Sequence, residues 1–347
     1  MSTSEAANKR LPTEQSATPP VLVDTFGRQH RSLRISVTDV CNIRCQYCMP
    51  AELAHFMPRD HLLSYEAIVQ FAQIAIDCSI NRFRITGGEP LTRPNLDTLI
   101  AQLSDLKGLN DLALTTNGIL LSQQADALVA AGLKRVNISL DTLSEATFKR
   151  LSRRDGISRV IDGIDAALAS ELDVKLNALV LRGVNSDDIL ELVDFAQQRK
   201  TTIRFIEFMP LDADGAWNDD TMISGEQLRT EITQHLGPLE PVPLKSKSQP
   251  AREFKLPGGG HVGFIDSVSS PFCSSCDRLR LTADGKLRNC LFGQQEWDVS
   301  ELLSKAEVDR KQVIETIRTC ILAKHAAHGI AQPGFKPPQR AMYQIGG

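Results

Sequence analysis

Residues 34–50 read "RISVTDVCNIRCQYCMP", and three cysteines follow directly on a run that predicts a β-strand. These are Cys41, Cys45 and Cys48, at the spacing C-x3-C-x2-C. A disulfide uses two thiols, and a structural zinc site usually takes four ligands. Three thiolates instead suit a 4Fe–4S cluster, because they bind three irons and leave the fourth iron open to another ligand. The stretch therefore predicts an iron–sulfur cluster at the end of a strand.

A second group of three cysteines lies in "CSSCDRLRLTADGKLRNC", residues 273–290. Cys273, Cys276 and Cys290 again supply three thiolates, so a second cluster with an open iron is the economical interpretation. Zinc remains an alternative at both places, with a histidine as fourth ligand. The candidates are His55 or His61 for the first triplet and His261 for the second.

The composition is that of an ordinary globular chain of 347 residues, with 42% hydrophobic and 23% charged residues. A net charge of −3 gives no support to nucleic-acid binding. Residues 1–20 lack the apolar core of a signal peptide and predict a disordered leader. No run of 18 apolar residues predicts a membrane span, so we expect a cytoplasmic protein. Cys78 and Cys320 stand alone in apolar contexts and are expected to be inert buried thiols.

Short apolar runs alternate with amphipathic helical patterns from residue 34 to residue 209. Polar residues and glycines follow most of these runs, which favours a barrel rim over the single switch point of a doubly wound sheet. We therefore predict an α/β fold, a partial (β/α)6 TIM-type barrel over residues 21–215, with a C-terminal extension over residues 216–347. That extension should contain loops, short antiparallel strands and a helix around 300–323. The predicted barrel strands are 34–40, 82–88, 111–118, 135–141, 173–180 and 202–209.

The cysteine motif "CNIRCQYC" resembles the signature of the radical S-adenosylmethionine (SAM) superfamily. The sequence "TGGEP", residues 86–90, is similar to the glycine motif of the same superfamily. The resemblance implies that SAM chelates the open iron through its amino and carboxylate groups. An electron then cleaves the sulfonium and gives a 5′-deoxyadenosyl radical.

Across Arg34 to the terminal "QIGG", the chain resembles one family of that superfamily, the GTP 3′,8-cyclases of molybdenum cofactor biosynthesis. Further matching motifs are "TTNG", "VNISLDT", "RFIEFMP" and "CSSCDRLRLTADGKLRNCL". The resemblance implies a lyase that cyclises GTP to (8S)-3′,8-cyclo-7,8-dihydroguanosine 5′-triphosphate. It also implies that the second cluster binds guanine.

The resemblance assigns roles to individual residues of this chain. It implies that the tail residues Gly346 and Gly347 reach into the catalytic cavity. Several cations around one pocket need an anion, which a triphosphate supplies. The implied SAM contacts are Tyr47, Gly88, Ser139 and Met209. The implied GTP contacts are Arg34, Arg84, Thr115, Lys175, Arg278, Leu279 and Arg280.

The partners that the resemblance implies are GTP, an external electron donor and the cyclic pyranopterin monophosphate synthase that receives the product. A homodimer is one expected assembly, and neither a membrane nor a nucleic acid is expected as a partner. A radical SAM maturase that modifies peptides is the alternative within the superfamily. A zinc-stabilised interaction module without catalytic activity is the alternative of a different class.

Overall fold

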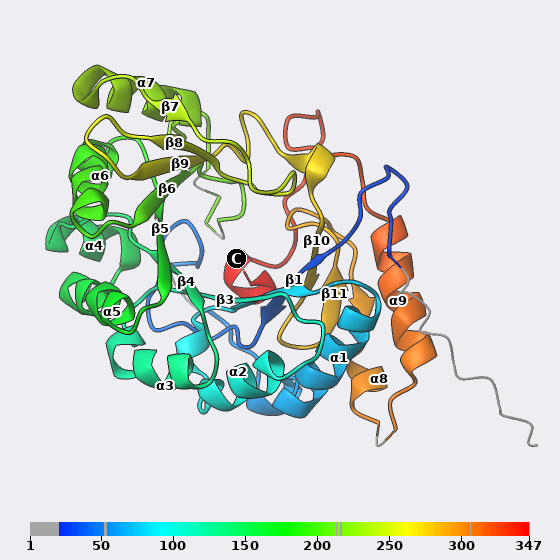
Figure 1. Ribbon diagram of the computed structural model, residues 1–347. Helices are drawn as coiled ribbons and strands as arrows, with labels where there is room; N and C mark the ends of the chain where they lie inside the picture. Colours follow the sequence, from blue (N-terminus) through cyan, green and yellow to red (C-terminus); the bar gives the residue numbers. More distant parts are fainter. Residues whose placement is uncertain (1–20, 52–53, 213, 216, 306, 347) are drawn as a thin grey trace, which may run out of the picture.

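Six parallel strands run in sequence order, β1 to β6, through the centre of one curved sheet (Figure 1). The computed structural model describes residues 21–51, 54–212, 214–215, 217–305 and 307–346. The predicted leader 1–20 and Gly347 lie outside the described residues. The six predicted barrel strands are confirmed, five of them with earlier ends, while the first, predicted over 34–40, begins and ends earlier in the sequence. They are β1 (Ser32–Ser36), β2 (Arg82–Thr86), β3 (Asp111–Thr116), β4 (Arg135–Ser139), β5 (Asp173–Leu179) and β6 (Thr202–Ile206).

The two faces of each strand differ sharply in polarity. In β1, Leu33 and Ile35 are buried in the hydrophobic core, whereas Arg34 lines a cavity on the other face. Successive side chains of a strand point to opposite faces, so one face of the sheet packs on helices and the other encloses polar groups. β2 repeats the pattern, with Phe83 in the core and Arg84 at the cavity.

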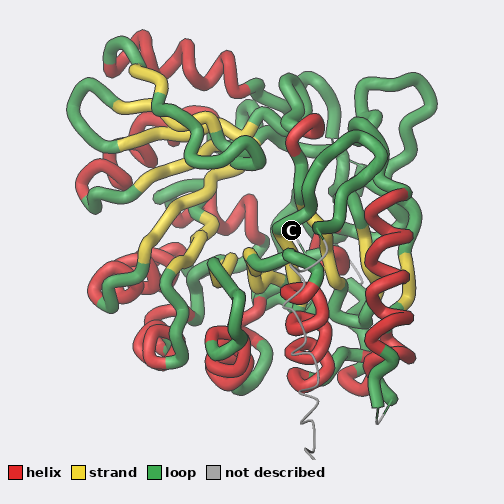
Figure 2. Tube along the Cα trace, turned by 45° about the vertical axis from the view of Figure 1, so that its right-hand side comes forward, coloured by secondary structure: helices red, strands yellow, loops and turns green. Residues whose placement is uncertain are grey.

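Helices after the strands cover the outer face of the curved sheet, as Figure 2 shows. The helix α1 begins where the Ser64 side chain accepts a hydrogen bond from the amide of Ala67, which makes Ser64 its N-cap. Its buried face includes Ile68 and Phe71, which belong to the same core as the outward residues of β1. The helices are α1 (Tyr65–Asp77), α2 (Leu96–Ser104), α3 (Ala125–Ala130), α4 (Glu145–Ser152), α5 (Ile157–Ala169) and α6 (Ile189–Gln198).

The C-terminal region extends the same sheet at both edges. The strand β10 (Arg278–Leu281) lies parallel to β1, and β9 (His261–Ile265) lies parallel to β6. Antiparallel strands then complete each edge. The sequence predicted these antiparallel strands but not the two parallel additions. The outer strands are β7 (Glu240–Pro241) and β8 (Arg252–Lys255) beyond β9, and β11 (Lys286–Arg288) and β12 (Trp297–Asp298) beyond β10.

The helices of the C-terminal region also differ from expectation. In place of one helix around 300–323 there are two, α8 (Ser300–Leu303) and α9 (Arg310–Leu322). The Asp309 side chain accepts from the amide of Gln312 and starts α9 anew. The helix α7 (Gly225–Leu236), which begins at a capping box on Ser224, was not predicted.

The chain ends inside the curve of the sheet, where Figure 1 marks the C-terminus. The short helix α10 (Met342–Ile345) leads to Gly346, whose carbonyl accepts a 2.7 Å hydrogen bond from Arg280 Nη1. A Cβ atom on Gly346 would lie 2.8 Å from Cβ of Ser36, and the residue has a φ of 85°. Glycine is therefore required for this close approach to the end of β1.

Because one sheet crosses the predicted boundary near residue 215, residues 21–215 should not fold alone. Their expression would leave the edges of β1 and β6 unpaired and expose the apolar residues that pack on β9 and β10. We expect aggregated fragment, measured by size-exclusion chromatography and circular dichroism against the full chain. A monomeric fragment with the helix content of six intact β/α units would contradict this expectation.

Candidate active site

Two adjoining cavities lie within the curve of the sheet, at the carboxyl ends of its parallel strands. The first cavity, of about 150 Å³, is lined by Cys41, Cys45 and Cys48. The second cavity, of about 270 Å³, is lined by Cys273, Cys276 and Cys290. The two share the lining residues Tyr47, Thr115, Ser139 and Met342. The structure thus places one cysteine triplet in each of two spaces that meet.

The first triplet sits on a tight loop in which the amides of Cys48 and Met49 both donate to the carbonyl of Cys45. All three cysteines are free thiols and only partly exposed. Burial raises the pKa of the Cys41 thiol to about 11 and that of Cys48 to about 12. Such thiols ionise at neutral pH only when a metal replaces the proton.

The predicted glycine motif holds the cysteine loop against β2. The amide of Gly88 donates to the carbonyl of Thr38 at 2.7 Å, and the amide of Glu89 donates to that of Val40 at 2.8 Å. A Cβ atom on Gly88 would lie 2.4 Å from the carbonyl oxygen of Asp39. Gly88 also lines the first cavity, so it shapes the cavity wall and positions the loop that leads to Cys41.

The buried carboxylate of Glu89 joins this loop to the end of β3. It accepts hydrogen bonds from the Asn117 amide at 2.6 Å and the Thr116 hydroxyl at 2.7 Å. Burial raises the pKa of Glu89 to about 7, although these hydrogen bonds favour its charged form. Glu89 also caps the turn at Leu91. The sequence analysis did not single out Glu89 itself, although it noted the motif that contains it.

Tyr47 lies where the two cavities meet. Its hydroxyl donates to Asp141 Oδ2 at 2.5 Å, and Asp141 also accepts from the amide of Leu179 at 2.8 Å. Burial raises the pKa of Asp141 to about 6. Of the other predicted SAM contacts, Ser139 lines both cavities and Met209 lines the second one only.

Three arginines form a row on the inner face of the sheet. Arg34 of β1 is the register neighbour of Arg84 in β2 and of Arg280 in β10. Like charges directly opposite one another on adjacent strands destabilise a sheet. Burial, followed by the neighbouring arginines, lowers the pKa of Arg34 well below its ordinary value. The same causes lower the pKa of Arg84 to about 9 and that of Arg280 to about 10.

Arg278 and Arg204 complete a set of five guanidinium groups around the second cavity. Arg278 stacks over the Phe272 ring at 4.6 Å, and its Nη2 atom is buried without a hydrogen-bond partner. Within the part of the chain that the structure describes, none of the five arginines forms an ion pair with a carboxylate. The Thr115 hydroxyl is also buried without a partner at this wall. Five cations and an unpaired hydroxyl indicate an anionic ligand.

Arg204 is the cavity arginine that the sequence analysis missed. Its Nε donates to Asn177 Oδ1 at 3.0 Å and its Nη2 to Asn137 Oδ1 at 2.5 Å, so both partners are uncharged. The available signal was a charge within the apolar strand "TIRFIEFM". Gly263 of β9 makes room for it, because a Cβ there would lie 2.9 Å from Arg204 Cγ.

Two predicted GTP contacts, Lys175 and Leu279, do not line the second cavity. Lys175 Nζ pairs with Glu253 Oε1 at 3.2 Å and is absent from the lining of either cavity. Leu279 lies between Arg278 and Arg280 on β10, so its side chain points to the other face and packs in the hydrophobic core. Arg34, Arg84, Thr115, Arg278 and Arg280 are brought together in the second cavity as expected.

The second triplet lies in a more positive environment than the first. Burial raises the pKa of the Cys276 thiol, but Lys324 and Arg278 outweigh it, and the net effect lowers that pKa. At the first triplet, burial is the largest cause that raises the pKa of Cys41 and Cys45. The carboxylate of Glu89 raises the pKa of Cys41 further, and the carboxylate of Asp141 raises that of Cys45 further. The strongest charges acting on Cys276 are therefore positive and those acting on Cys41 and Cys45 negative, whereas burial raises the pKa of Cys273.

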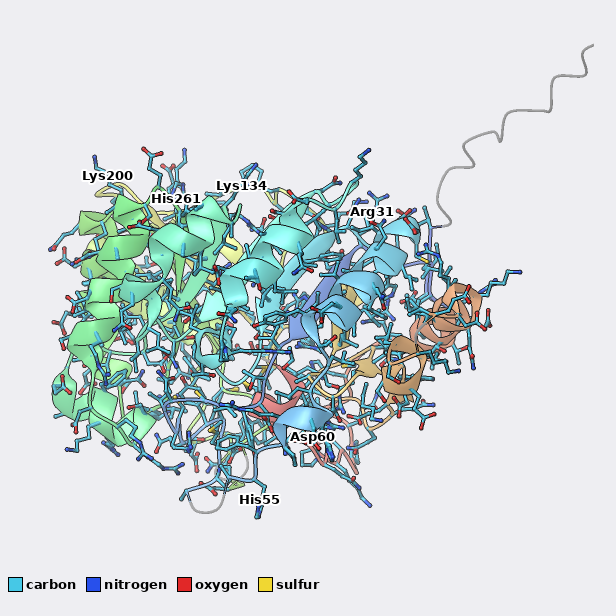
Figure 3. All side chains as sticks on the ribbon, turned by 90° about the horizontal axis from the view of Figure 1, so that it is seen from below. Arg31, His55, Asp60, Lys134, Lys200 and His261 are labelled. Carbon is cyan, nitrogen blue, oxygen red and sulfur yellow. The ribbon has the colours of Figure 1, made fainter. Side chains whose placement is uncertain are left out.

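The geometry gives no support to zinc at either triplet. Among the described residues, no three His, Cys, Asp or Glu side chains lie close enough to hold one metal ion. A zinc ion needs all its ligands within about 2.3 Å, whereas each thiolate of a cluster can bind a different iron. The histidines proposed for zinc are badly placed: His55 is exposed, and His261 lies at the opposite end of the strands, as Figure 3 shows.

Comparison with known proteins agrees with this architecture. Residues 35–196 match the radical SAM superfamily, and residues 201–330 match the family described as Molybdenum Cofactor Synthesis C. A GTP 3′,8-cyclase of Rhodopirellula baltica is 48% identical over 95% of this chain and 93% of its own length. The chain belongs to the GTP 3′,8-cyclase family.

Other relatives and solved structures extend the comparison. A GTP 3′,8-cyclase of Moorella thermoacetica is 44% identical over 93% of this chain and 99% of its own. Human molybdenum cofactor biosynthesis protein 1 is 40% identical over 93% of this chain and 51% of its own. Streptococcus suis SuiB bound to S-adenosylmethionine has a TM-score of 0.58 at 16% identity, covering 84% of this chain and 69% of its own, and therefore shares the fold. In the described part of the chain, no helix is long and apolar enough to cross a membrane.

The packing of the glycine motif generates a prediction about the first triplet. Gly88→Ala should displace the cysteine loop, because its Cβ would overlap backbone oxygen, and should therefore reduce the iron held by the first triplet. Iron per chain is measured after anaerobic reconstitution, in a variant that also lacks the second triplet. The matched control is Gly258→Ala, whose Cβ would meet only the Gln197 side chain at 3.3 Å. Wild-type iron content in Gly88→Ala would contradict the positioning role.

Proposed function

We propose that this chain cyclises GTP to (8S)-3′,8-cyclo-7,8-dihydroguanosine 5′-triphosphate, with SAM as cosubstrate, in the first step of molybdopterin biosynthesis. The observation that carries the proposal is the content of the two adjoining cavities. Each has one triplet of free cysteines, and five arginines without carboxylate partners surround the second cavity. The names of the relatives support the same substrate.

The first cavity suits SAM. Cys41, Cys45 and Cys48 would hold a 4Fe–4S cluster that, with SAM bound, supplies a 5′-deoxyadenosyl radical. Tyr47 and Ser139 stand where the two cavities join, so they would position the nucleoside part of SAM toward the second cavity. Met209 would contact it from the far side of that junction.

The second cavity suits GTP. The guanidinium groups offer charge-assisted hydrogen bonds to phosphate oxygens, for which their planar fork is well matched. Thr115 offers a buried hydroxyl at the same wall. Cys273, Cys276 and Cys290 would hold a second 4Fe–4S cluster near which the guanine binds, between the aromatic side chains of Phe272 and Phe292.

The protein's own contribution to the reaction would be position and exclusion of water. The shared wall of the two cavities brings a ribose in the second cavity close to the SAM bound in the first. Met342 of the tail lines both cavities, and Arg280 holds the carbonyl of Gly346 beside the end of β1. We propose that the tail, with Gly347 beyond it, shields reactive intermediates from solvent. An external electron donor, hand-off to a cyclic pyranopterin monophosphate synthase and a homodimer stay predictions from the resemblance.

The decisive experiment is an anaerobic reaction with GTP, SAM and dithionite, followed by chromatography of cyclised nucleotide and 5′-deoxyadenosine. The wild type should form both. Cys45→Ser should form neither, whereas Cys290→Ala should still cleave SAM slowly but give no cyclised product. Cys78→Ser, which changes a buried thiol outside both cavities, is the control. Wild-type enzyme that cleaves SAM without consuming GTP would contradict the proposed substrate.

If the second cavity binds the phosphates of GTP, substitutions of Arg204 and of Lys175 should change GTP affinity by different amounts. Arg204→Ala should weaken GTP binding about 10- to 150-fold, the equivalent of roughly 1.5–3 kcal/mol for a charge-assisted contact. Lys175→Ala should cost less, since Glu253 already neutralises Lys175. Affinities are measured by equilibrium dialysis with GTP and with guanosine, and guanosine should be little affected. Arg199, which is only partly exposed and lies outside both cavities, is also paired with a carboxylate, that of Asp165, and provides the control Arg199→Ala. A larger effect at Lys175 than at Arg204 would contradict this assignment.

A further inference from the structure

Lys324 is a buried cation that the proposed reaction does not use. It follows α9, and it is only 5% exposed. Its ammonium group donates to the carbonyl of Arg278 at 3.0 Å and to the carbonyl of Asn289 at 2.5 Å. Among the described residues it forms no ion pair with a carboxylate. A buried ammonium group is costly unless negative charge lies close to it.

The two carbonyls that Lys324 binds are on the segments that lead to two of the second-triplet cysteines. Arg278 is two residues after Cys276, and Asn289 directly precedes Cys290. Lys324 therefore ties together β10 and the end of the β10–β11 hairpin behind the second cavity.

Arg28 holds the third cysteine of this triplet in the same way. Its Nη1 donates to the carbonyl of Cys273 at 2.8 Å. The same guanidinium donates to the carbonyls of His325 and Ala326, directly after Lys324. Its charge, however, is matched by Asp24, with which it forms a buried ion pair.

The basic residues around the second triplet differ in whether an acidic side chain balances their charge. Arg28 and Asp24 neutralise each other. His30 adds no positive charge at neutral pH, because burial, and then Lys324, lower its pKa to about 4. Lys324 is left as the buried cation with no acidic side chain as partner. Lys324 acts electrostatically on the Cys276 thiol, so the thiolates that a bound cluster would create there lie within reach of its charge.

We propose that Lys324 and Arg28 are positioning residues of the second triplet, with separate tasks. Arg28 fixes the Cys273 loop to the segment after α9. Lys324 fixes the other two cysteine segments and supplies the positive charge that favours the reduced, more negative state of the cluster bound there. The inference rests on the proposed function, because it requires that the second triplet bind a cluster.

The test is a redox titration of the reconstituted protein, followed by electron paramagnetic resonance of each cluster. The variants are Lys324→Gln, which removes the charge, and Lys324→Arg, which keeps it. At a fixed potential, Lys324→Gln should lower the ratio of reduced to oxidised second cluster at least tenfold, a shift of about 59 mV to more negative potential for one electron. The first cluster should not move, which provides an internal reference.

The matched control is Lys311→Gln, which removes an exposed charge on α9 and should shift neither potential. An unchanged second potential in Lys324→Gln would overturn the inference. If Lys324→Gln loses the second cluster, Lys324→Arg decides: recovery of the cluster supports the role of charge, and loss in both variants overturns it. Arg28→Gln should lower iron at the second triplet while the potential of what remains stays unchanged. Wild-type protein with iron at the first triplet only would instead overturn the proposed function, and the inference with it.

Discussion

The enclosure of five guanidinium groups within one curved sheet is the constraint on which the rest of the structure depends. Strand alternation is what makes it possible, because the same strands that carry Arg34 and Arg84 inward carry Leu33 and Phe83 outward into the core. The core residues hold the strands in register, and the register places three of the five guanidinium groups, those of Arg34, Arg84 and Arg280, in one row. An anion in the cavity offsets the repulsion that this row creates. If the second cavity binds a polyphosphate as proposed, that binding would therefore also stabilise the barrel interior.

The side chains that hold the two cysteine triplets in place have opposite charges. The first loop depends on backbone contacts across Gly88 and on the buried carboxylate of Glu89, which ties β2 to the end of β3. The segments of the second triplet depend on the cations Lys324 and Arg28. These bind backbone carbonyls at or within two residues of the three cysteines. Negative surroundings disfavour addition of an electron and positive surroundings favour it. Clusters bound at the two triplets, as proposed, would therefore differ in reduction potential.

Local patterns in the sequence predict those parts of the fold that local interactions determine. The six barrel strands follow from the alternation of short apolar runs with amphipathic helical patterns. The edge positions of β9 and β10 could not be predicted this way, because a strand's neighbour is set by contacts distant in sequence. For the same reason Lys175 and Arg204 looked alike, each a charge within an apolar strand. Only the placement of β8, which brings Glu253 to Lys175 and leaves Arg204 with neutral partners, distinguishes them.

The docking of the C-terminal region on the barrel completes the candidate site. β10 contributes Arg278 and Arg280 to the cavity, and its pairing with β1 places Arg280 beside Arg34. Arg280 also binds the carbonyl of Gly346, so the tail is held by a residue that faces the substrate cavity. A phosphate oxygen that competes for this guanidinium would change how tightly the tail is held. With GTP bound in the second cavity as proposed, Arg280 would therefore link ligand binding to the position of the tail.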